Sequence, residues 1–172
     1  LERLGEAGAD VGVASIEMAE ITGWNKDDWG EDVEVHLRIA DADVDIVQIG
    51  RGELKGSLTK AVFPNLAFSV TDFSLQLRTC GVLGSTNLTI AMLLDSTGPS
   101  ASWGRDLRQG DVFFSAPGRN FDAVFGERSN VAGISISPDE IASSFAGEPL
   151  LADVDFWRQN HQFSCEPDLR VA

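Results

Sequence analysis

The feature that most constrains this chain is a succession of short alternating segments separated by turn residues. Apolar and polar side chains alternate with a period of two, which is typical of half-buried β-strands. Gly, Pro, Asn and Ser recur between these segments at spacings of roughly 8–12 residues, which favours a β-sandwich or a barrel. Strands are expected at residues 45–49, 54–63, 66–70, 73–77, 87–94, 111–115, 120–125 and 131–136.

The turn residues also predict how some of these strands connect. Residues 96–102 are rich in Gly, Pro and Ser and are expected to form a loop. Pro117-Gly118 is expected to turn the chain so that strands 111–115 and 120–125 pair with each other. Strands and helices do not alternate along the sequence, which argues against a parallel nucleotide-binding sheet.

A short helix and a strand are predicted before the strand-rich region. In residues 15–24, Ile16 and Ala19 fall at helical spacing, and Gly23 is a plausible stop. Residues 33–39 then alternate strictly between apolar and polar side chains, which predicts a strand.

Two short helices are predicted after it. Ser137 can accept a hydrogen bond from a backbone amide of the first turn, Pro138 suits the first helical position, and Glu140 completes a capping box. This helix should run to about Phe145, and a second is expected at residues 153–163. The chain is thus predicted to hold an N-terminal arm (1–42), a β-barrel (43–146) and a C-terminal helical tail (147–172).

The charge balance excludes several classes of partner. The chain has 13 Lys and Arg against 27 Asp and Glu, so its formal net charge is −14. Binding to nucleic acid depends on cations that displace the counterions of the phosphates. Direct contact with DNA or RNA is therefore not expected, and anionic membranes should repel the chain as well.

Cysteines and hydropathy bear on the compartment. Cys80 and Cys165 lie far apart in sequence and outside any Cys/His cluster, so free thiols in a reducing cytosol are the simplest interpretation. Apolar runs stay shorter than the ~18 residues that a membrane span needs, and no signal-peptide pattern is visible. The expected location is the cytoplasm.

The most specific motif is a strand between two turns. Gly110-Asp111 leads into an apolar segment, and Pro117-Gly118 follows it. The segment resembles the second conserved motif of the cupin superfamily, in which a metal-binding His follows the Pro-Gly turn. The corresponding position here is Phe121, which cannot ligate a metal.

The other cupin motif is missing as well. It supplies a His-x-His pair and a Glu, whereas His36 and His161 each lack a second His two residues away. Iron, manganese or nickel chemistry needs several such ligands on one face. We therefore expect a barrel without a metal or another cofactor.

A second resemblance covers residues 43–146. Residues 45–58 resemble the opening strands of the N-terminal domains of AraC-type transcription regulators, which often begin with an Asp…Gln-Leu…Gly…Gly-x-Leu pattern. Trp103-Gly104-Arg105 matches their Trp-Gly turn, Leu107 opens a matching strand, and residues 137–145 match their short capped helix. In that family this half binds a small effector, dimerises, or both, and a half with two helix-turn-helix units follows.

The resemblance implies a mostly β fold, a cupin-like double-stranded β-helix barrel (jelly roll) with short flanking helices. It implies the effector-sensing and dimerisation domain of an AraC-type regulator, with a small-molecule effector and a homodimer, and no enzymatic activity. The sequence contains no helix-turn-helix half, so the chain is expected to be a sensor domain taken from a regulator or a stand-alone relative.

Two other functional classes stay open. One is a metal-free cupin-like barrel enzyme with isomerase-like acid/base chemistry, which needs facing carboxylates. The other is a dimerisation-only interaction module, which needs a sealed interior and an apolar surface patch. An open pocket with an arginine at its mouth favours sensing.

Candidate ligand contacts follow from the alternation. Because barrel interiors take alternate residues, the rows Leu66/Phe68/Val70, Leu88/Ile90/Met92 and Val112/Phe114 are expected to face inward. An arginine at the rim would favour a carboxylate or another anion. The ligand-binding candidates are Arg78, Trp103, Arg105, Phe68, Ile90, Met92, Phe114 and Phe121, and no residue is expected to be catalytic.

Overall fold

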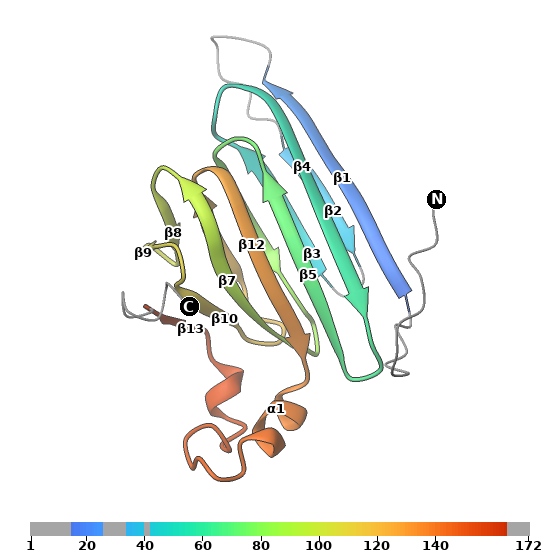
Figure 1. Cartoon of the computed structure of the whole chain (residues 1–172), viewed down its shortest axis with the longest axis vertical. Helices are drawn as coiled ribbons and strands as arrows, with labels where there is room; N and C mark the ends of the chain where they lie inside the picture. The colour runs from blue at the N-terminus through green and yellow to red at the C-terminus, as the bar shows by residue number, and fades with distance from the viewer. Residues whose placement is uncertain (1–14, 26–33, 40–41, 165–172) are drawn as a thin grey trace, which may run out of the picture.

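Figure 1 shows the computed structural model, which describes residues 15–25, 34–39 and 42–164. These residues form two antiparallel β-sheets, so the chain is mostly β, as the alternation predicts. Aromatic and aliphatic side chains from both sheets share one core, which includes Leu77, Leu93, Phe113, Phe121 and Phe125. The sheets are therefore held face to face by the burial of their inner apolar side chains.

The first sheet has seven strands and forms the front layer in Figure 1. In spatial order they are β1 (Ser15–Asn25), β4 (Gly52–Val62), β5 (Leu66–Phe73), β12 (Glu127–Ile136), β7 (Leu88–Thr97), β10 (Val112–Ser115) and β13 (His161–Phe163). The second sheet has six strands. In spatial order they are β2 (Glu34–Ile39), β3 (Ala42–Gln48), β6 (Leu77–Val82), β11 (Phe121–Phe125), β8 (Ser100–Ser102) and β9 (Arg105–Leu107).

The segment expected to be an N-terminal helix is strand β1. It pairs with β4 along its whole length, from Ser15 opposite Val62 to Asn25 opposite Gly52. A short helix is marginal without a partner, whereas this strand completes a continuous ladder of backbone hydrogen bonds. The helix prediction is therefore wrong, and the strand predicted at residues 33–39 is confirmed as β2.

Strands β10 and β11 do not pair with each other, so that prediction is also wrong. β10 lies between β7 and β13, whereas β11 lies between β6 and β8 in the other sheet. Gly118 has a φ of +64°, so the expected turn is present. It carries the chain from one sheet to the other, which lets Phe113 and Phe121 stack across the core with ring centroids 5.4 Å apart.

Two connections between strands differ from the expectation. The strand expected at 73–77 is interrupted by a turn, because the backbone N–H and Oγ of Ser74 bond to the C=O and N–H of Lys55, both at 2.8 Å. The loop expected at 96–102 instead holds the end of β7 and all of β8, joined through Gly98 at a φ of +102°.

The predicted helix after β12 is confirmed as α1 (Pro138–Ser144). The Oγ of Ser137 accepts a hydrogen bond from the Glu140 amide at 3.1 Å, which is the expected N-cap. Ile141 and Ala142 are buried and pack with Leu88 and Trp157 in a second apolar cluster below the seven-stranded sheet.

The prediction of a second helix at residues 153–163 is wrong. After one 3₁₀ turn, η1 (Phe156–Arg158), the tail returns to the sheet as β13. Gln162 accepts a hydrogen bond from the Oγ of Ser102 at 2.7 Å, and Asn160 accepts one from the amide of Ala116 at 2.8 Å. These side-chain bonds and the β10 ladder tie the tail to the edges of both sheets, which an isolated amphipathic helix would not do.

On β5, β7 and β10, the residues that were expected to face inward face outward. The prediction of which alternate residues point into the core is therefore wrong on these three strands. Phe68 and Met92 are 46% and 36% exposed on the outer face of the seven-stranded sheet. Ile90 and Phe114 also lie on that face, covered by the α1–Trp157 cluster. The inner face holds mostly smaller side chains. Because the outer face is also apolar, the hydrophobicity pattern pointed to the wrong face.

Candidate ligand-binding cavity

A cavity of about 130 Å³ lies between the two sheets. Its wall is mainly apolar, with the rings of Phe73, Phe113, Phe121 and Phe125 among the residues that line it. For comparison, engineered apolar cavities of about 150 Å³ bind benzene. The space is therefore sufficient for a small organic molecule. The lining residues are Ala42, Val44, Ile46, Leu58, Lys60, Ala67, Ser69, Thr71, Phe73, Thr79, Leu83, Thr89, Ala91, Phe113, Phe121, Phe125, Val131, Gly133 and Ser135.

Small side chains in register make this space. Across the inner face, Lys60 of β4 lies opposite Ser69 of β5, which lies opposite Gly133 of β12. The row continues through Ala91 of β7 to Phe113 of β10. A Cβ on Gly133 would lie 3.0 Å from the Ser69 Oγ, so even an alanine would crowd this row. The side of the cavity formed by the seven-stranded sheet therefore leaves open space, because Ser, Gly and Ala are adjacent across three strands.

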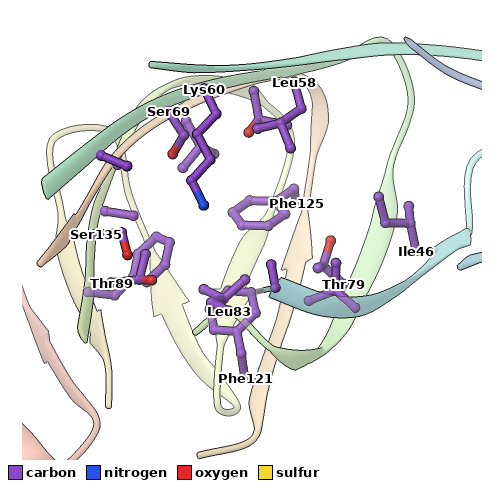
Figure 2. Close-up of a pocket in the computed structure, with 18 of the residues that line it drawn as sticks. Ile46, Leu58, Lys60, Ser69, Thr79, Leu83, Thr89, Phe121, Phe125 and Ser135 are labelled. Carbon is purple, nitrogen blue, oxygen red and sulfur yellow. The ribbon is translucent and has the colours of Figure 1, made fainter. Parts of the chain in front are cut away.

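Lys60 carries the one charged side chain among the residues that the structure describes around the cavity. It is 9% exposed, and Figure 2 shows its ammonium group directed into the space between the sheets. A buried ammonium requires hydrogen-bond acceptors or a counter-charge nearby. Lys60 does interact within the chain, and an ammonium has three N–H donors to distribute.

Two hydroxyls around the cavity have no hydrogen-bond partner within the described ranges. They are the Oγ1 of Thr79, from β6, and the Oγ of Ser135, from β12. Both residues are at least nine-tenths buried, at 7% and 9% exposure. Burying a hydroxyl without a partner costs roughly 1–3 kcal/mol. The pair therefore marks two places where a ligand or a water molecule would gain a hydrogen bond.

A row of hydroxyls extends from Ser135 across the seven-stranded sheet. Ser135 lies opposite Thr89, which lies opposite Ser115 of β10. The Oγ of Ser115 is also buried and unpartnered among the residues that are described. One end of the inner face is therefore polar, while the other end is formed by phenylalanines and aliphatic side chains.

The polar end leads to the surface. A wider hollow of about 490 Å³ lies at the β4–β5 turn and the start of α1, lined in part by Pro64 and Glu140. Lys60, Ala67 and Ser135 line both this hollow and the inner cavity. These shared residues form the boundary between the two spaces, so a ligand would reach the cavity past the lysine.

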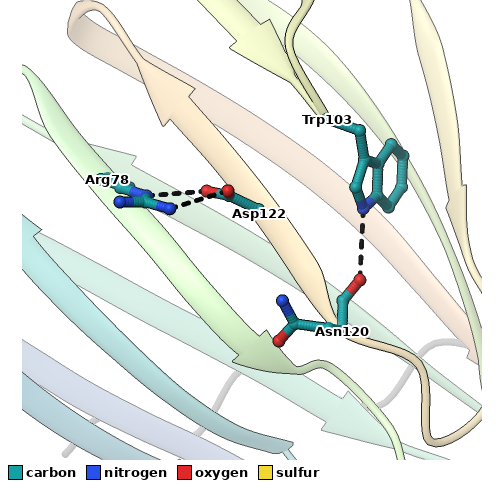
Figure 3. Close-up of polar contacts among 4 residues, drawn as sticks. All are labelled: Arg78, Trp103, Asn120 and Asp122. Atoms are coloured by element: carbon teal, nitrogen blue, oxygen red, sulfur yellow. Dashed lines mark hydrogen bonds and ion pairs between the residues drawn. The ribbon is translucent and has the colours of Figure 1, made fainter.

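Of the ligand-binding candidates taken from the sequence, Phe121 alone lines the cavity. Trp103 lies behind it, with its ring edge-to-face against Phe121 at 5.6 Å and its Nε1–H donating to the Asn120 carbonyl at 3.2 Å (Figure 3). Trp103 thus supports the cavity wall from outside. Phe68, Ile90, Met92 and Phe114 lie on the outer face, so a role for them in binding an enclosed ligand stays a prediction without geometric support.

The two candidate arginines lie away from the cavity. Arg105 is exposed on β9. Arg78 lies on the outer face of the six-stranded sheet, where its Nε and a terminal nitrogen each donate to an Asp122 carboxylate oxygen at 2.8 Å (Figure 3). The hydrogen bond from Arg78 holds the pKa of the Asp122 carboxyl below its ordinary value. The residues that replace them near the cavity are Lys60, Thr79 and Ser135.

Among the described residues, no group of three or more His, Cys, Asp or Glu is placed to hold a metal ion. Cys80 is partly buried and forms no disulfide in this part of the chain, and Cys165 lies outside the described residues. No helix in the described ranges is long and apolar enough to cross a membrane.

No protein-family model matches the sequence. No curated protein matches it either. Among solved structures, the chain is similar to the crystal structure of the AraC-like transcriptional activator CuxR, with a TM-score of 0.42 and 11% identity. The match covers 55% of this chain and 36% of the other, so the chain spans about a third of that protein. A likeness of this size shows no shared function.

Proposed function

We propose that this chain is a small-molecule-binding domain with a cupin-like barrel, and that it senses an effector for a transcription regulator of the AraC type in the cytoplasm. The observation that carries the proposal is an apolar cavity lined by a lysine and by two buried hydroxyls that have no hydrogen-bond partner among the described residues. Pockets for small ligands commonly combine apolar walls with a few placed polar groups. The order of motifs in residues 43–146 supports the assignment to a regulator.

Sensing rather than catalysis fits the chemistry of the lining. The polar groups are hydroxyls and an ammonium, which bind and orient a ligand by hydrogen bonds and charge. An isomerase of the kind left open above would work through facing carboxylates. Because the lining comes from both sheets, a ligand that bridges them favours whichever arrangement of the sheets fits it best. In a regulator that preference is transmitted as a population shift.

The test is native mass spectrometry of freshly purified protein, compared with the mass after denaturation. An additional small organic mass that is lost on denaturation supports the proposal. A matched variant is Ala91→Leu, which fills the floor of the cavity and should lose that mass while the protein remains folded by circular dichroism. Retention of the mass in Ala91→Leu would contradict binding in this cavity, and a metal mass would contradict the metal-free assignment.

Dimerisation is a second proposed role, and a surface feature favours it. The outer face of the seven-stranded sheet exposes Phe68 and Val70 of β5 beside Met92 and Leu94 of β7, with β12 between them. These four side chains are uncharged on a chain of net charge −14. Two copies therefore meet with the least electrostatic repulsion across this apolar face.

Sedimentation equilibrium tests the dimer. Met92→Lys places a charge in the middle of the face and should shift the protein to monomers. Leu150→Lys is the matched control, because Leu150 is 64% exposed and lies outside the sheet face. A monomeric wild-type protein, or a dimer that Met92→Lys leaves intact, would rule this face out as the interface.

A further inference from the structure

The cavity has a defined chemical polarity, which restricts its ligand. Figure 2 shows Lys60 and Ser135 on one side of the space and Thr79 on the other, with the ring of Phe125 between. The lysine side is also the side shared with the outer hollow. A molecule in this cavity therefore meets a cation and a hydroxyl at the entrance, an apolar middle, and one more hydroxyl beyond.

We infer that the ligand is a small carboxylic acid with a flat apolar body and a hydroxyl at its far end. This inference rests on the proposed binding function. The carboxylate lies at Lys60 and accepts a hydrogen bond from the Oγ of Ser135. The body lies against the phenylalanine walls, and the distal hydroxyl bonds to the Oγ1 of Thr79. Both of the unpartnered hydroxyls that line the cavity then have a partner.

Lys60 is suited to a carboxylate rather than to a neutral ligand. The residue is 9% exposed, and charge-assisted hydrogen bonds are about twice as strong as neutral ones. The interaction that Lys60 makes within the chain does not conflict with this, because three N–H donors point in different directions. Ser69, Gly133 and Ala91, which lie in register with Lys60, are small and line the same cavity.

The acidic surface does not outweigh this local preference. The net charge of −14 is distributed over the whole chain, and at physiological salt the field of an exposed charge decays over about 8 Å. Inside the cavity, water screens the lysine much less. The repulsion slows the approach of an anion, whereas the affinity depends on the contacts made after entry.

The size of the cavity limits the ligand as well. About 130 Å³ is close to the space of a single six-membered ring, and a carboxylate on that ring reaches toward the wider hollow. We therefore choose benzoate, benzamide and 4-hydroxybenzoate as probes. Benzoate and benzamide have nearly the same shape and differ in charge, and 4-hydroxybenzoate adds the distal hydroxyl.

Isothermal titration calorimetry on the 172-residue chain measures the three affinities. Benzoate should bind at least about 10-fold more tightly than benzamide, as expected for one charge-assisted hydrogen bond. Lys60→Met should remove that ratio and leave the benzamide affinity within about 3-fold. Lys55→Met is the matched control on the same strand, since Lys55 is exposed and pairs with Glu53 at 3.1 Å. It should leave all three affinities unchanged.

The distal hydroxyl is tested separately. 4-Hydroxybenzoate should bind about 5-fold more tightly than benzoate to the wild-type protein, and Thr79→Val should abolish that advantage while leaving the benzoate affinity in place. Both comparisons are ratios within one protein sample, so a loss of folded protein in a variant does not imitate the expected result.

The outcomes separate this inference from the proposed function. Equal binding of benzoate and benzamide to the wild-type protein overturns the carboxylate assignment, while binding in the cavity stands. A benzoate preference that persists in Lys60→Met overturns the role of Lys60. Failure of all three probes overturns the inference, and if native mass spectrometry also finds no bound organic molecule, the proposed function fails with it.

Discussion

Replacing Thr79 with valine should stabilise the ligand-free protein, although threonine is almost completely buried there. Thr79 is 7% exposed, and its Oγ1 has no hydrogen-bond partner among the residues that the structure describes. A buried hydroxyl without a partner costs roughly 1–3 kcal/mol, and valine has nearly the same shape without that cost. Valine also suits a strand at least as well as threonine does.

We expect a gain of about 1 kcal/mol, at the low end of that range. The cavity of about 130 Å³ is large enough to admit water, which offsets part of the cost of the hydroxyl. For a chain of this length, about 1 kcal/mol corresponds to a rise in Tm of roughly 2–4 °C. Urea denaturation gives the free energy of unfolding, and the midpoint should rise with an unchanged m-value.

Ser102→Ala provides the opposite result as a control. Ser102 is fully buried, and its hydroxyl donates to the Gln162 Oε1 at 2.7 Å. Removing it leaves a partner unsatisfied and should cost about 1–2 kcal/mol. If Thr79→Val destabilises the protein as much as Ser102→Ala does, the Thr79 hydroxyl has a partner after all, and the assignment of the cavity as a place for a hydrogen-bonding ligand loses its basis.

Three further predictions concern the parts that surround the cavity. Ser137→Ala removes the N-cap of α1 and should lower the free energy of unfolding by about 1 kcal/mol, measured by urea denaturation; an unchanged midpoint would contradict the cap. Trp157 of the tail is 3% exposed and packs against Leu88 and Ile141, so Trp157→Ala should cost about 3–5 kcal/mol and release residues 147–164 to hydrogen exchange, whereas protection equal to wild type would contradict this anchoring. The pKa of Asp122 is lowered in the folded protein by Arg78, so the stabilisation is present above the ordinary value of 3.8 and is lost as pH falls through the lowered pKa; an NMR titration should find this pKa higher in Arg78→Gln, and an unchanged value would refute the pairing.

Local signals in the sequence predicted the elements that depend on local chemistry. Alternation located most strands of both sheets, because the period of two follows directly from the pleat. The N-cap of α1 was predictable from Ser137 and Pro138, whose effects act within one turn. The pairing of β1 with β4 was not, since it joins residues that are far apart in sequence, from Asn25 with Gly52 to Ser15 with Val62, and no local pattern encodes the partner.

The cavity residues were not predicted, because the alternation on these strands was assigned to the wrong face. On β5, Phe68 and Val70 are larger and more apolar than Ser69 and Thr71, so the pattern favours the first pair as core. The structure places Ser69 and Thr71 inside. Lys60 was not among the candidates, because lysine is almost never fully buried and no local pattern marks this one as an exception. Thr79 also faces inward, on a strand that begins at Leu77 after the turn at Ser74 and so lies outside the strand expected at 73–77.

The placement of large apolar side chains outside and small ones inside links the stability of the fold to ligand binding. Large side chains such as Phe68 and Met92 are partly exposed outside, while Ala67, Ala91 and Gly133 leave space inside. At about 24 cal/mol per Å³, keeping the space of about 130 Å³ empty costs up to roughly 3 kcal/mol, which is a large share of the ~5–15 kcal/mol that stabilises a typical domain. A ligand present at 100 times its dissociation constant stabilises the folded state by about 2.7 kcal/mol. The two quantities are similar, so an occupant of ordinary affinity can offset the whole cost of the cavity. A sequence under selection for stability alone would fill the floor at Ala91, and the open floor therefore supports the proposed binding function.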